Sequence, residues 1–328
     1  MRDPAFYGMM PVSISHEGYS AKPMHSYWDN FWALRGYKDA ADIAGVLGKS
    51  DEQPLMAGAR DEFRNDLAAS LLAAVRAHGI DYLPGSAELG DFDATSTTIA
   101  LAPGGEQGRL PSDLLDNTFQ RYWNEFVQRR DGTRQWKDYT PYEWRNVSAF
   151  VRLGWRDRAW DALSFFFKDR APQPWNQWAE VVSRTPRKPF FVGDLPHAWV
   201  ASDFVRSVLD MFVYGREVDD SLVLAAGLPP RWFEGQGVSI ADLRTPHGPL
   251  GYSLRRSDRQ LVLDVQPGIV VPAGGLVLPW PYSGKPGDAT INGEDAQWEN
   301  GELRIHAVPA HVEIDVPSSV RRAERKRD

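Results

Sequence analysis

Residues 28–48 read WDNFWALRGYKDAADIAGVLG, and this stretch shows the pattern that decides the fold of the first two thirds of the chain. Apolar side chains recur every three or four residues, beginning with Trp28, Phe31 and Trp32 and continuing to Leu47. Side chains at this spacing lie on one face of an α-helix, and a glycine such as Gly48 commonly ends one. The stretch therefore predicts one long helix.

The same spacing predicts further helices as far as Gly215. We expect them over about 54–78, 93–101, 114–127, 141–153, 156–168 and 198–214. Short connections between helices favour antiparallel neighbours. The chain should therefore contain about three and a half helical hairpins.

After Gly215 the pattern changes from helical to extended. Proline and glycine become frequent, and short alternating runs appear at 261–265 and 303–307. Asn292-Gly293 is typical of the two-residue turn of a β-hairpin. We therefore expect a mainly α protein with a C-terminal β domain: a helical-hairpin domain over 1–217, a small antiparallel β-sandwich over 218–318, and a flexible basic tail over 319–328.

Composition excludes several classes of protein. Hydrophobic residues make up 42% and charged residues 25%, the net charge is −7, and no run approaches the ~18 apolar residues of a membrane span. Basic residues cluster only in the tail, so we expect neither a membrane nor a nucleic acid as partner. There is no cysteine, and the seven histidines are scattered, so we expect no metal and no cofactor. No signal peptide is visible, which leaves open whether a longer parent protein is exported.

Residues 175–199 carry the strongest indication of function. Trp175, Trp178 and Trp199 lie near one carboxylate, Glu180, and one histidine, His197. Sugars offer flat C–H faces that stack on indole rings and hydroxyl groups that need hydrogen-bond partners. The stretch therefore predicts a carbohydrate pocket, although tryptophans more often fill protein cores.

Several segments, in this order along the chain, resemble the six-hairpin glycosidases, most closely the α-L-rhamnosidase-like group. They are Asp93-Ala-Thr-Ser-Thr-Thr-Ile-Ala-Leu101, Thr140-Pro-Tyr142, Trp178-Ala179-Glu180, Pro196-His197-Ala198-Trp199 and the stretch from Thr245 to Tyr252. The segment Tyr27-Trp28-Asp29 is also similar to a signature of the related trehalases. The resemblance implies part of an (α/α) toroid followed by the β-sandwich, with Glu180 as the general base.

The resemblance implies an inverting glycoside hydrolase that acts on a plant or bacterial oligo- or polysaccharide. A complete toroid would need more than ~300 residues, so the early hairpins, which carry the general acid in that group, are expected to be absent. We expect the carbohydrate as the ligand. As a protein partner we expect either a second copy of this chain or the missing N-terminal region of the toroid. Two alternatives stay open: a non-catalytic carbohydrate-binding fragment and a trehalase-like hydrolase.

Inverting hydrolysis needs an acid and a base on opposite faces of the sugar. The base candidate is Glu180, and the acid candidates are Asp29, Glu88 and Asp91. The candidates for sugar binding are Trp28, His25, Trp178, His197, Trp199, Trp175, Glu143 and His16. Some residues of these segments have structural roles as alternatives. Asp93 is expected to cap a helix, Asp91 to stabilise the turn at Gly90, and Thr140 and Glu143 to form a capping box. Arg145 is expected in a solvated or inter-helix position. If the site exists, these residues should gather at one end of the helical domain.

Overall fold

The computed structural model describes residues 3–16, 18–135, 141–168, 170, 173–180, 194–257, 259–317 and 320. The chain divides into two compact units. The first comprises Met1–Leu153 and Ala162–Arg206, and the second comprises Gly154–Asp161 and Ser207–Asp328. In the described ranges, no helix combines the length and the apolar character that crossing a bilayer requires.

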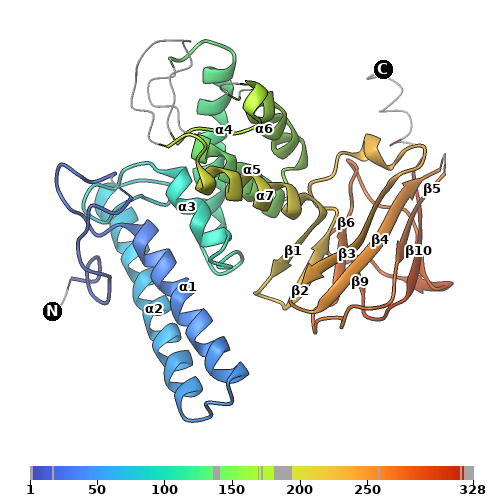
Figure 1. Cartoon of the computed structure of the whole chain (residues 1–328), viewed down its shortest axis with the longest axis horizontal. Helices are drawn as coiled ribbons and strands as arrows, with labels where there is room; N and C mark the ends of the chain where they lie inside the picture. Colours follow the sequence, from blue (N-terminus) through green and yellow to red (C-terminus); the bar gives the residue numbers. More distant parts are fainter. Residues whose placement is uncertain are drawn as a thin grey trace. The chain divides into compact units, whose positions relative to one another are not determined.

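Seven α-helices precede the strands in the described part of the chain, as Figure 1 shows in blue to yellow. They are α1 (Tyr27–Val46), α2 (Glu52–His78), α3 (Ala94–Leu101), α4 (Ser112–Arg130), α5 (Arg145–Arg152), α6 (Arg156–Lys168) and α7 (Ala198–Phe212). Each corresponds to a helix that the spacing of apolar residues predicts, with ends shifted by a few residues. The local pattern is sufficient because a helix is stabilised by contacts between its own neighbouring turns.

Helices α1 and α2 form an antiparallel hairpin (Figure 1). The buried face of α1 includes Tyr27, Phe31 and Leu34, and the Tyr27 hydroxyl lies 2.9 Å from the Ser70 hydroxyl on α2. Helix α2 ends at Gly79, whose φ of 62° is the left-handed conformation that glycine adopts readily at a helix end. This hairpin supplies one of the walls of the site described below.

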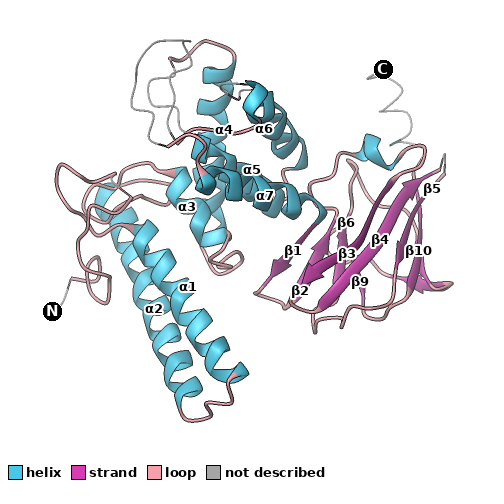
Figure 2. Ribbon diagram, viewed as in Figure 1, coloured by secondary structure: helices cyan, strands magenta, loops and turns pink. Residues whose placement is uncertain are grey.

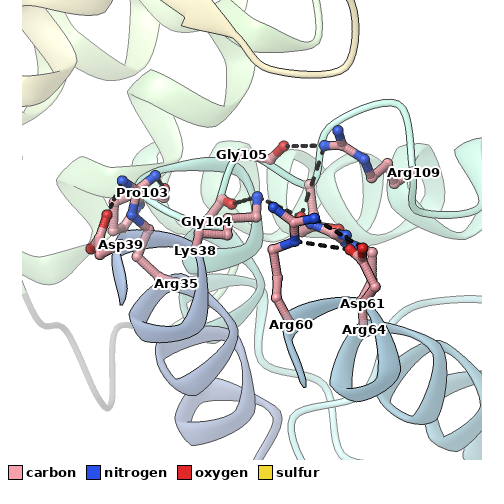
Figure 3. A network of polar contacts seen from close by, with 11 residues as sticks. Arg35, Lys38, Asp39, Arg60, Asp61, Arg64, Pro103, Gly104, Gly105 and Arg109 are labelled. Atoms are coloured by element: carbon pink, nitrogen blue, oxygen red, sulfur yellow. Dashed lines mark hydrogen bonds and ion pairs between the residues drawn. The ribbon is translucent and has the colours of Figure 1, made fainter. Parts of the chain in front are cut away.

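A buried ionic cluster joins this hairpin to the loop after α3. Glu106, whose side chain is only 4% exposed, lies with its Oε1 2.5 Å from Lys38 Nζ of α1 and its Oε2 3.0 Å from Arg64 Nε of α2. Figure 3 shows Lys38 and Arg64 converging on this loop, where Lys38 also donates to the Gly104 carbonyl. Buried charges persist only when they are paired, so the cluster fixes the loop against both helices.

Helices α3 and α5 are strongly enclosed: every residue of α5 is buried, every residue of α3 but Thr95 is buried, and α3 packs against α1 and α5. Residues Pro141–Trp144 form a single 3-10 turn, η1, before α5. The predicted capping box is not formed through Glu143: its carboxylate instead accepts from the Tyr122 hydroxyl at 2.6 Å and from Arg129 Nη1 at 2.7 Å, both on α4. A full charge on Arg129 binds the carboxylate more strongly than a backbone N–H would. Thr140, the other half of the box, lies outside the described residues.

In the second unit, the described residues form ten strands in two sheets, and the strands are drawn in magenta in Figure 2. The first sheet has the order β1-β2-β6-β9, formed by Val213–Arg216, Ser221–Leu224, Leu276–Pro279 and Glu302–Ile305. The second has the order β3-β4-β5-β10-β7-β8, formed by Val238–Thr245, Gly248–Arg256, Gln260–Val265, Ala310–Asp315, Ala289–Ile291 and Glu294–Ala296. All pairings are antiparallel except that of β2 with β6.

The predicted strands and turn of this unit are present. Strand β5 covers the run at 261–265 and β9 covers most of the run at 303–307, and in both strands buried and more exposed residues alternate. Asn292 and Gly293 link β7 to β8 with φ values of 53° and 85°, the positive angles that the predicted hairpin turn requires. Helices followed by antiparallel-rich sheets confirm the predicted fold class.

Candidate functional site

A cavity of about 480 Å³ opens in the first unit. This volume lies within the range of about 300–1,000 Å³ that small-molecule sites occupy. Its lining comes from five parts of the chain: the loop before α1, α1 itself, the start of α3, the η1–α5 segment, and the loop leading into α7. The lining residues are His16, Trp28, Asp93, Thr95, Tyr142, Arg145, Glu180, Asp194, His197 and Trp199.

Three aromatic rings surround the guanidinium of Arg145. Its Cζ lies 4.7 Å from the ring centre of Trp28, 4.6 Å from that of Tyr142 and 5.3 Å from that of Trp199. The Trp28 and Trp199 ring centres are 5.9 Å apart, and those of Tyr142 and Trp199 are 5.7 Å apart. A cation over aromatic faces is attracted to their negative charge density, so Arg145 orients all three rings. Of the two positions predicted for Arg145, solvated or inter-helix, the structure shows the inter-helix one, because the residue is only 6% exposed and pairs with Asp203 of α7.

Asp203 of α7 holds Arg145 in place through an ion pair. Arg145 Nε donates to Asp203 Oδ2 at 2.8 Å, and the two side chains are 6% and 13% exposed. Burial raises the pKa of the Asp203 carboxyl to about 6, while the charge of Arg145 opposes this rise. At neutral pH the two groups form an ion pair. Arg145 Nη2 is also buried, and no hydrogen-bond partner for it lies among the described residues.

A hydrogen-bonded chain runs through His197. The Tyr142 hydroxyl lies 2.5 Å from His197 Nε2, and His197 Nδ1 lies 3.6 Å from Asp194 Oδ2. Burial and the nearby charge of Glu180 raise the pKa of Tyr142 to about 12, so its phenol keeps its proton at neutral pH. The phenol oxygen and Nε2 share one hydrogen bond, and either atom can be its donor, depending on the tautomer of the His197 ring.

Two backbone hydrogen bonds hold Glu180 and His197 side by side. The Glu180 amide donates to the Asp194 carbonyl at 3.0 Å, and the His197 amide donates to the Trp178 carbonyl at 3.0 Å. These bonds join the two ends of the segment that leads from Glu180 to α7. Glu180, Asp194 and His197 therefore form one wall of the cavity.

Asp93 lies on a different element, at the start of α3. It caps this helix as predicted, because its Oδ1 accepts from the Ser96 amide at 3.0 Å and its Oδ2 accepts from the Ser96 hydroxyl. Its Oδ2 also lies 3.9 Å from His16 Nε2. The His16 ring in turn packs on Trp28, with ring centres 4.7 Å apart. The cap thus presents a second carboxylate to the cavity that Glu180 lines.

The structure brings five of the predicted site residues to the cavity wall. They are Glu180, Trp28, His16, His197 and Trp199. Trp28 is buried, whereas Trp199 is 43% exposed and is therefore the more accessible of the two indoles.

The three acid candidates do not line the cavity, because each has other partners. Asp29 accepts from the hydroxyls of Ser13 and Ser15. Glu88 accepts from the His25 amide at 2.9 Å and lies 2.6 Å from His25 Nδ1, so His25 does not line the cavity either. Asp91 accepts from the Tyr19 hydroxyl at 2.9 Å and from the Ser86 hydroxyl at 2.7 Å. The bond to Ser86 braces the turn around Gly90, as the structural alternative for Asp91 predicts.

The remaining sugar-binding candidates also lie outside the lining. Trp178 is a core residue: it is 4% exposed, its indole N–H donates to the Phe166 carbonyl at 3.2 Å, and its ring packs on Trp144. Trp175 is 58% exposed, and Glu143 is bound to α4 as described above. A tryptophan in a predicted site is thus as readily a packing residue as a sugar platform.

Sequence reasoning missed four lining residues and gave a fifth, Asp93, only a capping role. The four are Thr95, Tyr142, Arg145 and Asp194. Asp194 precedes His197 by three residues, a spacing that places a carboxylate beside a histidine at a helix start. Nothing in the sequence around Arg145 distinguishes it from the many arginines of helix surfaces.

Comparisons with known proteins give a distant likeness only. No family model and no curated relative matches the sequence. Among solved structures the chain is similar to an alpha-L-rhamnosidase from Dictyoglumus thermophilum, with 10% sequence identity and a TM-score of 0.49. The match covers 88% of this chain and 31% of the rhamnosidase chain, so this chain spans about a third of the length of the rhamnosidase.

In the described residues, no three His, Asp or Glu side chains converge in a way that would hold a metal ion.

Proposed function

We propose that the cavity binds a sugar and that the chain carries the general-base side of a glycoside hydrolase site. The observation that carries this proposal is the lining itself: aromatic faces of Trp28, Tyr142 and Trp199 share one cavity with the carboxylates of Glu180 and Asp93. Indole and phenol rings suit the C–H faces of a pyranose, and carboxylates accept hydrogen bonds from its hydroxyls.

Glu180 is the proposed general base. An inverting glycosidase uses one carboxylate to activate water and another carboxyl group, on the opposite face of the sugar, to protonate the leaving oxygen. Asp194 cannot be that opposite group, because its backbone pairs with Glu180 on the same wall. Asp93 starts a different helix, so it is the proposed second carboxylate and replaces Asp29, Glu88 and Asp91 in that role.

The capping bonds of Asp93 support a second candidate function, sugar binding without hydrolysis. A carboxyl group that accepts hydrogen bonds from both the amide and the hydroxyl of Ser96 is held as an acceptor, whereas a general acid must carry a proton. In that case the acid belongs to another part of a longer protein, and this chain alone binds sugar without turnover.

Two conservative substitutions test the catalytic proposal. Glu180→Gln removes the anion that would activate water and keeps the shape of the side chain, so hydrolysis should fall roughly 10²-fold or more. Asp93→Asn keeps a good helix cap and should lower turnover by a similar factor if Asp93 is the acid. Hydrolysis is measured on aryl rhamnosides, glucosides and arabinosides, and sugar affinity is measured by calorimetry.

Glu313→Gln is the matched control, because Glu313 is 44% exposed on β10, in the other unit. Unchanged turnover in Glu180→Gln would exclude Glu180 as the base. Sugar binding without turnover, in the unmodified chain and in both variants, would establish the second candidate function. A chain that neither binds nor hydrolyses any of these sugars would refute both.

A further inference from the structure

His16 occupies a position in the cavity lining that suits the transfer of a proton. It comes from the loop before α1, and its side chain is 33% exposed, so a bound molecule can reach it. Histidine is the side chain that most often acts as an acid or a base near neutral pH. The proposed hydrolysis needs an acid, and the bonds from Ser96 hold Asp93 as a hydrogen-bond acceptor.

The contacts of one ring nitrogen fit the protonated form of His16. Its Nδ1 lies 3.1 Å from Ser15 Oγ, and Ser15 Oγ lies 3.0 Å from Asp29 Oδ1. In a protonated imidazole both nitrogens are donors, so Nδ1 donates to the Ser15 oxygen while the Ser15 hydroxyl donates to the Asp29 carboxylate. Asp29, which does not line the cavity, thus orients the His16 ring through Ser15.

The other ring nitrogen, Nε2, lies beside Asp93, which also lines the cavity. The distance from Nε2 to Asp93 Oδ2 is 3.9 Å, which is too long for a hydrogen bond. At this distance the carboxylate still attracts the charge of a protonated ring but does not take up the Nε2 proton. Since the two side chains are 33% and 25% exposed, this proton is available to an oxygen of a bound sugar.

Trp28 connects His16 to the side of the cavity that carries Glu180. The ring centre of Trp28 lies 4.7 Å from that of His16 and 5.9 Å from that of Trp199. Trp199 comes two residues after His197, which shares one wall of the cavity with Glu180. His16 and Glu180 therefore belong to different parts of the lining with aromatic rings between them, as a separate acid and base require.

We propose that His16 is the general acid of the site. Its Nε2 proton passes to the glycosidic oxygen while the bond from this oxygen to the anomeric carbon breaks and the electron pair stays on the oxygen. Glu180 takes a proton from the water whose oxygen forms the new bond to the anomeric carbon. Solvent then returns a proton to His16 and removes one from Glu180. Asp93 is in this scheme the carboxylate that stabilises protonated His16.

This inference rests on the proposed function, because it takes the reaction to be glycoside hydrolysis with Glu180 as the base. Two aryl glycosides of the same sugar separate the acid from the base. Methoxyphenolate is a poor leaving group that needs a proton, whereas dinitrophenolate leaves without one. In the full chain, His16→Gln should lower kcat/KM for the methoxyphenyl glycoside roughly 10²-fold or more and leave the dinitrophenyl glycoside nearly unchanged. Glu180→Gln should lower both, because both reactions need activated water.

Added imidazole gives a second measurement. In His16→Ala it should restore turnover of the methoxyphenyl glycoside, because free imidazole fits the space that the truncation leaves and supplies the missing proton. His311→Gln is the matched control: His311 also lies beside a carboxylate, with its Nδ1 2.6 Å from Asp264 Oδ1, but it is 52% exposed on β10 in the other unit. This control should hydrolyse both substrates like the unmodified chain. Thermal unfolding curves establish that each variant is folded.

Equal losses on the two substrates in His16→Gln, or no loss on either, would overturn the inference and leave the proposed function intact. A selective loss on the methoxyphenyl glycoside that is larger in Asp93→Asn than in His16→Gln would assign the proton to Asp93 and overturn the inference as well. Hydrolysis of the dinitrophenyl glycoside alone by the unmodified chain would show a base without an acid, which also overturns it. Hydrolysis of neither substrate would refute the hydrolase proposal, and the inference would fall with it.

Discussion

Replacing Glu106 with Gln should be among the most destabilising conservative changes in the first unit. Glu106 Oε1 lies 2.5 Å from Lys38 Nζ, and Oε2 lies 3.0 Å from Arg64 Nε, in a site where the Glu106 and Lys38 side chains are 4% and 7% exposed (Figure 3). Glutamine keeps the shape of the side chain but places a neutral amide between two cations. Removing one partner of a buried ion pair typically destabilises a protein by 3–5 kcal/mol.

The contacts that Arg64 and Lys38 keep in Glu106→Gln place the expected loss of stability at the lower end of the range of about 3–5 kcal/mol. Arg64 retains a second carboxylate, since its Nη1 lies 2.7 Å from Asp61 Oδ1, and its side chain is 21% exposed. Lys38 also donates to the Gly104 carbonyl, but its side chain is only 7% exposed, so water can compensate its ammonium least. Most of the penalty therefore falls on Lys38, and we expect Glu106→Gln to lower the free energy of unfolding by about 3 kcal/mol.

Urea unfolding followed by tryptophan fluorescence measures this change. The double variant Lys38→Met/Glu106→Gln should recover at least half of the loss, because it removes the buried ammonium together with the carboxylate that neutralises it. Asp39→Asn is the control: Asp39 is 45% exposed and pairs with Arg35 on the same helix, so its removal should change stability by no more than about 0.5 kcal/mol. A loss below about 1 kcal/mol for Glu106→Gln, or no recovery in the double variant, would refute this reasoning.

Two further predictions concern the cavity. Burial raises the pKa of Asp203 from 3.8 to about 6, so between these values the folded protein binds a proton that the unfolded chain releases. The free energy of unfolding should therefore fall, relative to Asp203→Asn, by about 2 kcal/mol between pH 4 and pH 7. Parallel pH profiles of unfolding for the two proteins would contradict this. Trp199→Ala should weaken sugar binding about tenfold in calorimetry, because it removes the more accessible indole of the cavity; unchanged affinity would exclude Trp199 as a sugar platform.

The secondary structure was largely predictable because its signals are local. The spacing of apolar residues locates α1 and α2 to within a few residues, and Gly79 marks the end of α2 through its own backbone conformation. Asn292-Gly293 specifies its hairpin turn for the same reason, since both residues tolerate positive φ. The capping role of Asp93 was also predictable, because a cap involves only the next three residues.

The site was predictable only in part. The sequence by itself determined that aromatic and acidic residues gather at 175–199, and Glu180, His197 and Trp199 do line the cavity. The acid candidates do not line the cavity and have other partners, and for Glu88 one of these partners is His25, 63 residues earlier in the chain. No local pattern reveals such a partner.

Tertiary structure alone decided the role of Arg145. Its environment is made by Trp28, Trp199 and Asp203, which lie more than 50 residues away along the chain. Periodicity indicates which face of a helix is apolar, but it does not indicate which other segments cover that face. The burial of Arg145 and its ion pair with Asp203 both arise from this long-range packing, and for that reason only the folded chain shows that Arg145 lines the cavity.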